Sequence, residues 1–226
     1  FVGSKDTVFL ARNREMGLDG ITRPTLGFGV CFGDFDLDAD LDLFVANGHV
    51  WDLSPLKLDY QFAMDSQLFL NHEGRQFRDI SATSGEWFQQ TRVGRAVTVG
   101  DLDNDGDEDV VVTSLKSPVA LLRNDSARDS GSVLVRLIGT TAARDPRGVR
   151  VDMKLGENWL TRRISSGDSF QSAASPEVLF ATNRHDRIGI VRVHWPNRSP
   201  EEWHNIPVTG KLILTEGRSS VFELQL

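Results

Sequence analysis

Residues 100–109 read GDLDNDGDED and run directly into the apolar stretch VVVTS at residues 110–114. Aspartate stands at every second position from Asp101 to Asp109. Carboxylates about 5 Å apart repel each other by about 1 kcal/mol even in water, so this spacing requires a compensating positive charge. Oxygen ligands at alternate positions of a short loop, with glycine at the sixth position, are what a hard divalent cation such as Ca2+ needs. The stretch therefore predicts a calcium-binding loop.

The predicted ligands are the aspartates of this loop. The spacing assigns a side-chain oxygen to four of them and a backbone carbonyl to the fifth, namely Asp101, Asp103, Asp105 and Asp109 through their side chains and Asp107 through its backbone. The loop differs from an EF-hand, which requires a glutamate at position twelve and a helix on each side. Position twelve is Val112, and the valine-rich flanks at 97–99 and 110–112 predict strands.

A second copy of the loop reads GDFDLDADLD at residues 33–42. It lies 67 residues upstream, since 101 minus 34 is 67, and its strand-like flanks keep the same register. Its predicted metal ligands are Asp34, Asp36, Asp38, Asp40 and Asp42. At the position where the second copy has Gly106, the first copy has Ala39. Alanine adopts a left-handed turn at a cost of about 1 kcal/mol, so we expect a distorted or weaker first site. An acidic run is more often a solvated face or a tail, but strict alternation, duplication and strand flanks argue against that interpretation.

Composition limits the class of protein. The chain has 226 residues, 39% hydrophobic and 25% charged residues and a net charge of -7, which is typical of a soluble globular chain. Its acidity is concentrated in the two loops, which argues against nucleic acid as a partner, and no apolar run reaches the length of a membrane span.

Cys31 is the single cysteine, so an intrachain disulfide is excluded and a buried small apolar side chain is expected. Because the chain begins at Phe1, we expect a fragment or a processed product.

The chain divides into two predicted regions. In residues 1–125 each acidic loop belongs to a unit of about four short strands, including a hairpin at 67–80, and repeats of this length are typical of β-propeller blades. Two blades and the tail of another do not close a ring, so we expect part of a larger propeller, or open edges covered by another chain or by the C-terminal part of this one. In residues 126–226 apolar and polar residues alternate at period two, which predicts a β-sandwich. The predicted strands there are 133–137, 149–153, 159–162, 190–195 and 211–214. The predicted class is all-β.

Two resemblances follow from these residues. The acidic loops with their strands and hairpin resemble the FG-GAP/VCBS repeat of β-propellers, whose Asp-x-Asp-x-Asp-Gly-x-x-Asp loop binds Ca2+. The second copy matches that pattern at 101, 103, 105, 106 and 109, and the first matches at 34, 36, 38 and 42 without the glycine. From residue 121 onward the chain resembles an ASPIC/UnbV domain, on residues 144–151, 166–172, 175–177 and 191–197. The combination is similar to the cartilage acidic protein-like family, which implies calcium-stabilised blades and an adhesive or undefined role.

Catalytic patterns are lacking in the sequence. The five histidines show no metal-ligand spacing, and neither a nucleophile elbow nor a phosphate-binding glycine loop occurs, so we expect no enzyme. The five tryptophans at 51, 87, 159, 195 and 203 could line a sugar-binding face, although tryptophan in β domains usually lies in the core.

The sequence thus predicts a non-enzymatic binding or adhesion-type protein with two structural Ca2+ ions. Extracellular modules bind Ca2+ with dissociation constants of roughly 10⁻⁴ to 10⁻³ M, which predicts a secreted, periplasmic or cell-surface protein. The expected partner is an extracellular protein or carbohydrate, with association through open blade edges. The alternative is an accessory carbohydrate-binding or C-terminal portion of an extracellular hydrolase.

Overall fold

The computed structural model describes residues 2–3, 9–52, 54–56, 61–126, 131–165, 167 and 169–224. Strands dominate this part of the chain, as predicted, and the helical segments are short. The helical segments are α1 (Asp19–Thr22), η1 (Ser54–Leu56), η2 (Ser81–Thr83) and η3 (Glu86–Gln89). A small antiparallel pair joins β1 (Val2–Gly3) to β2 (Phe9–Leu10). None of the described helices is long and apolar enough to cross a membrane.

The first N-terminal sheet is antiparallel and has the strand order β3-β4-β5-β6. Its strands are β3 (Gly27–Gly33), β4 (Asp42–Asn47), β5 (Gln67–His72) and β6 (Gln76–Asp79). The predicted hairpin at 67–80 is present as the pair β5–β6. Strand β4 is buried along its whole length, because both of its faces are covered by apolar neighbours.

The second N-terminal sheet repeats this arrangement with the order β7-β8-β9. Its strands are β7 (Gly94–Gly100), β8 (Asp109–Ser114) and β9 (Ala120–Leu122). The last pair of the β7–β8 ladder is Gly100 with Asp109, and the last pair of β3–β4 is Gly33 with Asp42. Each acidic loop therefore starts and ends at the same ladder position.

The two N-terminal sheets pack against each other through a shared apolar cluster. Cys31 and Phe44 of the first sheet meet Val97 and Val112 of the second in this cluster. Cys31 is 2% exposed, which agrees with its predicted burial. The strands also approach closely, since a Cβ on Gly29 would come within 2.5 Å of the Arg95 carbonyl oxygen.

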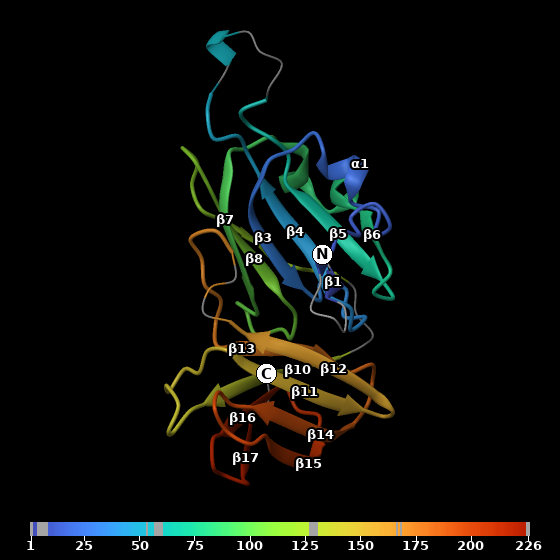
Figure 1. The fold of residues 1–226 in the computed structure, drawn as a ribbon, viewed down its shortest axis with the longest axis vertical. Helices are drawn as coiled ribbons and strands as arrows, with labels where there is room; N and C mark the ends of the chain where they lie inside the picture. Colours follow the sequence, from blue (N-terminus) through green and yellow to red (C-terminus); the bar gives the residue numbers. More distant parts are fainter. Residues whose placement is uncertain are drawn as a thin grey trace.

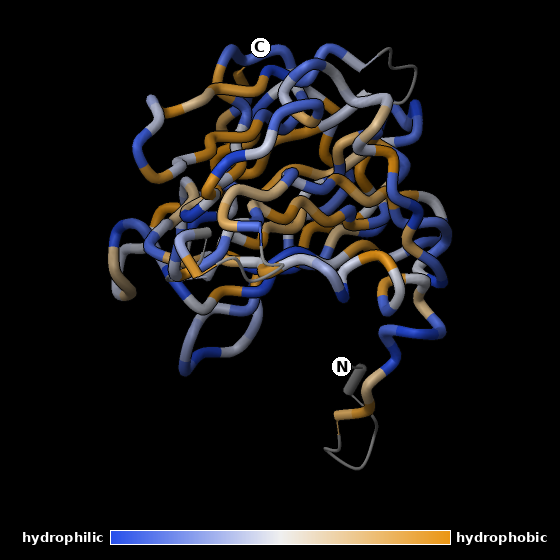
Figure 2. Tube along the Cα trace, turned by 90° about the horizontal axis from the view of Figure 1, so that it is seen from above, coloured by the Kyte–Doolittle hydropathy of each residue, from blue (hydrophilic) through white to orange (hydrophobic). Residues whose placement is uncertain are grey.

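The C-terminal region, residues 131–224, is sandwich-like. One sheet has the order β13-β10-β16-β17 and the other β12-β11-β14-β15, with β10 and β16 parallel and the other pairs antiparallel. The strands are β10 (Ser132–Ile138), β11 (Val149–Leu155), β12 (Asn158–Ile164), β13 (Glu177–Ala181), β14 (Arg187–His194), β15 (Glu201–Pro207), β16 (Lys211–Thr215) and β17 (Val221–Leu224). Both sheets contribute to one apolar core, which includes Trp195 and Trp203. Across the whole chain, apolar segments are concentrated in the interior of the trace and hydrophilic segments are frequent in the outer turns (Figure 2).

The five strands predicted in this region are present as β10, β11, β12, β14 and β16. Strands β13, β15 and β17 were not predicted. Among the described strands no sheet closes on itself, so a propeller remains a prediction for the N-terminal region.

The sandwich-like region lies at the end of the N-terminal sheets where the acidic loops are (Figure 1). Leu37 of the first loop packs against Leu134 and Leu179 of the sandwich. In the second loop the Gly106 carbonyl accepts a hydrogen bond from the Ser132 hydroxyl. Both acidic loops are therefore part of the junction between the two regions.

A further junction contact comes from residues 169–172, which follow β12. The Ser169 hydroxyl accepts a 2.7 Å hydrogen bond from the Val30 amide, and the Ser172 hydroxyl donates one of 2.7 Å to the Val97 carbonyl. Phe170 makes an edge-to-face contact with Phe28 at a centroid distance of 5.1 Å. This segment thus touches both N-terminal sheets.

Candidate functional site

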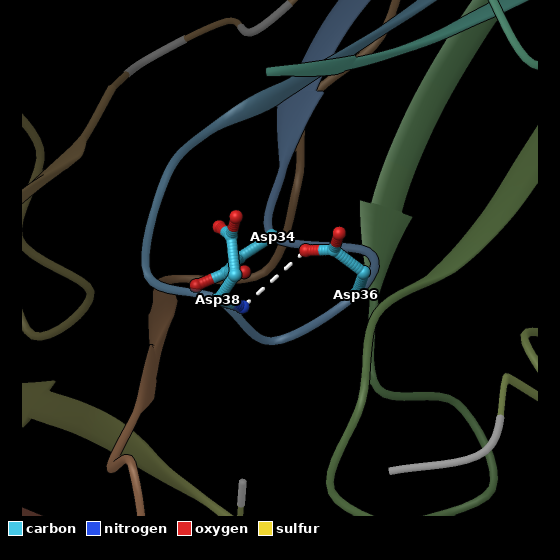
Figure 3. Close-up of side chains that lie close together, drawn as sticks. All are labelled: Asp34, Asp36 and Asp38. Carbon is cyan, nitrogen blue, oxygen red and sulfur yellow. Dashed lines mark hydrogen bonds between the residues drawn. The ribbon is translucent and has the colours of Figure 1, made fainter. Parts of the chain in front are cut away.

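Each acidic loop gathers three carboxylates. One oxygen from each of Asp34, Asp36 and Asp38 lies within 4.8 Å of the others. Figure 3 shows these side chains gathered inside the curve of the first loop, where the Asp38 amide also donates a 3.3 Å hydrogen bond to Asp36. In the second loop the equivalent group is Asp101, Asp103 and Asp109. Within the described residues both groups consist of carboxylates alone, a donor set suited to a hard cation.

The two loops have left-handed backbone φ angles at the same two positions. Leu37 has φ 56° and the equivalent Asn104 has φ 62°, while Ala39 has φ 84° and Gly106 has φ 91°. The replacement of glycine by alanine therefore does not change the turn, contrary to the expected distortion. It places a residue with a Cβ in the left-handed region, at a cost of about 1 kcal/mol.

The last aspartate of the first loop has an anchoring role that the sequence did not predict. Asp42 is fully buried, and its two oxygens accept hydrogen bonds from the Phe35 amide at 2.9 Å and the Asn71 amide at 2.8 Å. The Asn71 side chain also donates to the Leu41 carbonyl at 3.0 Å. Asp42 therefore ties the loop to the following hairpin, and it does not belong to the group of three.

Asp109 makes the equivalent pair of hydrogen bonds in the second loop. It is 2% exposed and accepts from the Leu102 amide at 3.0 Å and the Asn124 amide at 2.9 Å. The Asn124 side chain donates to the Phe35 carbonyl at 2.9 Å, which also connects the second loop to the first. Asp109 combines this anchoring role with a place in the carboxylate group.

The remaining predicted ligands lie around the two groups. Asp40 accepts a 3.1 Å hydrogen bond from the Gly74 amide, which attaches the first loop to the β5–β6 turn. Asp105 accepts one of 3.3 Å from the amide of Asp107, and Asp107 is fully buried. Asp40, Asp105 and Asp107 do not belong to the carboxylate groups found among the described residues.

The first aspartates of the two loops, Asp34 and Asp101, differ at one oxygen. One oxygen of Asp34 accepts from the Ala39 amide at 3.3 Å, and one oxygen of Asp101 accepts from the Gly106 amide at 3.2 Å. The second oxygen of Asp101, Oδ1, is buried and has no hydrogen-bond partner among the described residues. The second oxygen of Asp34 accepts from Arg162 at 3.1 Å.

Arg162 comes from β12 of the sandwich-like region. Its side chain is 10% exposed, and it donates both to Asp34 and, at 3.2 Å, to the Ala39 carbonyl. On the other side of Asp34, the Glu108 carboxylate accepts a 2.9 Å hydrogen bond from the Asp34 amide. Neither Arg162 nor Glu108 was predicted from the sequence as part of the site. One feature of the sequence does point to Arg162: it lies between Leu160 and Ile164, on the apolar face of an alternating strand, where a charged side chain needs a partner.

Burial controls the protonation of these carboxylates. It raises the pKa of Asp34 to about 7, although the Arg162 guanidinium acts in the opposite direction, and it raises the pKa of Asp42 to about 8. Burial also raises the pKa values of Asp101 and Glu108. Each of these charges is unfavourable where it lies, so a cation bound among them would be stabilising.

Among the described residues, the other candidates do not assemble into a site. His194 lies within 2.8 Å of Asp152 and 2.7 Å of Arg150 on β11, as part of a polar sheet face. Trp51 and Trp159 are 69% and 43% exposed but belong to different regions of the chain.

A cavity of about 680 Å³ lies at the junction. It is lined by Thr98 of β7, by Asp101 and Glu108 of the second acidic loop, and by Arg147 and Arg163 from the sandwich-like region. Charges of both signs face it.

The comparisons with known proteins identify the C-terminal region. A family model described as ASPIC and UnbV matches residues 139–221, so the chain carries an ASPIC/UnbV domain there. The match runs from the residue that follows β10 to the first residue of β17. The FG-GAP/VCBS resemblance of the N-terminal sheets stays a prediction, because the family comparison does not show it. A search of curated proteins finds no match.

Proposed function

We propose that this chain is a non-enzymatic, extracellular binding or adhesion-type protein whose two acidic loops bind structural Ca2+. The observation that carries the proposal is Asp101 Oδ1, a buried carboxylate oxygen without a hydrogen-bond partner among the described residues. A buried polar atom of this kind is costly unless a ligand satisfies it. Two more carboxylate oxygens, from Asp103 and Asp109, lie within 4.8 Å of an Asp101 oxygen.

In this proposal the ion has a structural role. Asp101, Asp103 and Asp109 hold one ion and Asp34, Asp36 and Asp38 hold the other, while the buried anchors of each loop fix its shape. Bound Ca2+ supplies the positive charge that offsets repulsion among the carboxylates. Since both loops touch the ASPIC/UnbV domain, the ions stabilise the surface on which that domain sits.

We further propose that residues 1–125 form FG-GAP/VCBS propeller blades and that residues 126–226 form the ASPIC/UnbV region. The equal ladder positions and equal turns of the two loops support the repeat. Open sheet edges are the proposed place of association, and Leu121 on β9, which is 69% exposed, is an apolar side chain available there. Millimolar Ca2+ outside cells matches the affinity expected for such modules, which supports a secreted, periplasmic or surface location.

The test is a calorimetric Ca2+ titration of chelator-treated protein, combined with thermal unfolding. We expect two ions per chain, one lost in Asp103→Asn and the other in Asp36→Asn. The control is Glu223→Gln, whose side chain is exposed on the edge strand β17, away from both acidic loops (Figure 1). At a free Ca2+ concentration of a hundred times the dissociation constant, linkage adds about 2.7 kcal/mol per site to the free energy of unfolding. An unchanged melting temperature and no binding heat would show that the loops are not metal sites.

The alternative proposal is an accessory carbohydrate-binding portion of an extracellular hydrolase. It is supported by Trp159, which is 43% exposed and has the Arg192 guanidinium 4.9 Å from its ring centroid. Trp195 and Trp203 do not support it, because both are buried in the core. A sugar bound beside Trp159 in a soaked crystal would favour this alternative.

A further inference from the structure

The two acidic loops share their turns and anchors and differ in charge environment at the first aspartate. The Asp101 oxygen that lacks a hydrogen-bond partner among the described residues corresponds to the Asp34 oxygen that accepts from Arg162. The contact from the sandwich-like region to the second loop is different in kind, because it is the neutral Ser132 hydroxyl donating to Gly106. One loop thus receives a positive charge from the neighbouring region, and the other receives an uncharged donor.

Arg162 is held firmly in this position. Its stem lies on the inward side of β12 between Leu160 and Ile164, and its guanidinium lies 5.5 Å from the ring centroid of Phe180. The same guanidinium nitrogen donates to Asp34 at 3.1 Å and to the Ala39 carbonyl at 3.2 Å. Both side chains of the ion pair are shielded, with 10% exposure for Arg162 and 1% for Asp34.

We propose that Arg162 is a built-in cation of the first loop, which makes residues 34–42 the weaker of two calcium sites and places Ca2+ in competition with Arg162 for Asp34. This inference rests on the proposed calcium-binding function and assigns to Arg162 a role in setting its affinity.

The physical reason is electrostatic. A guanidinium within hydrogen-bond distance of a ligand oxygen repels a divalent ion bound to the same carboxylate, and burial limits the screening of that repulsion by water and salt. The effect on the dissociation constant is about tenfold or more at the effective dielectric constants found near protein surfaces. The cation near the second loop is Arg123, whose charge interacts with Asp103 and Asp105, but its side chain is 63% exposed and therefore screened by water. Among the described residues that touch Asp101, none is a buried guanidinium.

Thermodynamic linkage makes the competition reciprocal. If Arg162 weakens Ca2+ binding by a given factor, bound Ca2+ weakens the Arg162–Asp34 contact by the same factor. At low Ca2+ only the second loop is filled, and Arg162 holds the junction closed at the first loop. At higher Ca2+ the first loop fills and this contact loosens, so the seating of the ASPIC/UnbV domain responds to Ca2+ in two steps.

The test measures each loop separately by Ca2+ calorimetry. The Asp103→Asn background isolates the first loop, and the Asp36→Asn background isolates the second. Adding Arg162→Met, which keeps an apolar stem beside Phe180, is expected to strengthen Ca2+ binding at the first loop about tenfold or more and to leave the second loop unchanged. Arg162→Lys keeps the charge and is expected to keep the first loop weak. Arg163→Met is the matched control, because Arg163 is the next residue of β12, is exposed and lines the junction cavity.

The outcomes separate this inference from the function on which it rests. Binding at both loops with an affinity that Arg162→Met leaves unchanged or weakens would overturn the role of Arg162 and leave the calcium proposal standing. Absence of Ca2+ binding in the unsubstituted protein would remove both.

If Arg162→Met does not fold, hydrogen exchange on the unsubstituted protein decides the question. Amide protection in β12 is expected to fall at the Ca2+ concentration that fills the first loop, and Asp36→Asn is expected to abolish that fall. Protection that stays constant through this range would overturn the inference.

Discussion

Asp109 and Asp103 belong to the same carboxylate group, yet their substitution by asparagine is expected to have opposite effects in a chelator. Asp109 is 2% exposed, and its oxygens accept hydrogen bonds from the Leu102 and Asn124 amides at 3.0 and 2.9 Å. Asparagine keeps one acceptor and turns its NH2 group toward a backbone N–H. The loss of one charge-assisted bond and the burial of an unmatched donor together destabilise the fold by about 2–4 kcal/mol. This destabilisation does not depend on metal.

Asp103 is exposed, and its role in the group is electrostatic. One of its oxygens lies within 4.8 Å of an oxygen of Asp101 and of Asp109. Each pair repels by about 1 kcal/mol at the dielectric constant of water, so Asp103→Asn is expected to stabilise the protein by about 1–2 kcal/mol in a chelator at low salt. In saturating Ca2+ the same substitution removes a ligand and forfeits up to about 2.7 kcal/mol of linkage at a hundred times the dissociation constant. The sign of its effect therefore reverses with Ca2+.

The assay is urea unfolding of the two variants and the unsubstituted protein, with chelator and with millimolar Ca2+. For a chain of this size, 2–4 kcal/mol corresponds to a melting temperature lower by roughly 5–10 °C, which thermal unfolding checks independently. Asp109→Asn as stable as the unsubstituted protein in chelator would refute the anchoring role. Asp103→Asn with the same sign of effect in both conditions would refute its assignment as a metal ligand.

Two further predictions concern contacts that do not involve metal. A double-mutant cycle of Phe28→Ala and Phe170→Ala is expected to give a coupling of about 1 kcal/mol in urea unfolding, and zero coupling would show that this edge-to-face contact does not join the regions. Glu216 is 1% exposed, and hydrogen bonds from the Thr141 hydroxyl and neighbouring amides hold its pKa well below the usual 4.5, so Glu216→Gln is expected to cost about 2–4 kcal/mol at pH 7. Because the folded-state pKa is depressed, this stabilisation is full above about pH 4.5 and declines as the pH falls further, so the variant's unfolding free energy should converge on that of the unsubstituted protein in acid. Equal differences at pH 7 and pH 3 would contradict this, and Glu157→Gln is the exposed control.

Strands with strict period-two alternation could be predicted, and the others could not for physical reasons. Strand β13 is a continuous apolar run because it is buried on both faces, with Phe180 in the sandwich core and Leu179 against the first acidic loop. Strand β17 is an edge strand whose side chains are mostly exposed, so it has little apolar pattern to detect. Strand β15 begins with two glutamates and also contains a polar pair at His204 and Asn205, which hides its alternation. Strand predictions based on apolar–polar alternation succeed where one face of the strand is buried and the other is exposed to solvent.

For the site, the sequence predicted which segments carry the carboxylates and missed what surrounds them. Alternation and duplication identified both loops, but only three aspartates of each loop form the close carboxylate group. The third member is the fifth loop residue, Asp38, in the first loop and the ninth loop residue, Asp109, in the second. Arg162 lies 128 positions from Asp34 and Glu108 lies 74 positions away, so no local spacing rule could connect them. Only the fold brings them together.

The junction also explains the departure of the first loop from its motif. Leu37 is 2% exposed and packs with Leu134, Leu179 and Ala181, and Ala39 packs against the same cluster. The equivalent positions in the second loop are Asn104, which is exposed, and Gly106. An apolar pair is therefore found where the first loop packs into an apolar cluster of the sandwich-like region, whereas the second loop has Asn104 and Gly106 and meets that region through a hydrogen bond from Ser132 to the Gly106 carbonyl. The strain of about 1 kcal/mol at Ala39 is offset by its contact with this cluster, so the alanine reflects docking against the neighbouring domain and does not require the loop to have lost its turn.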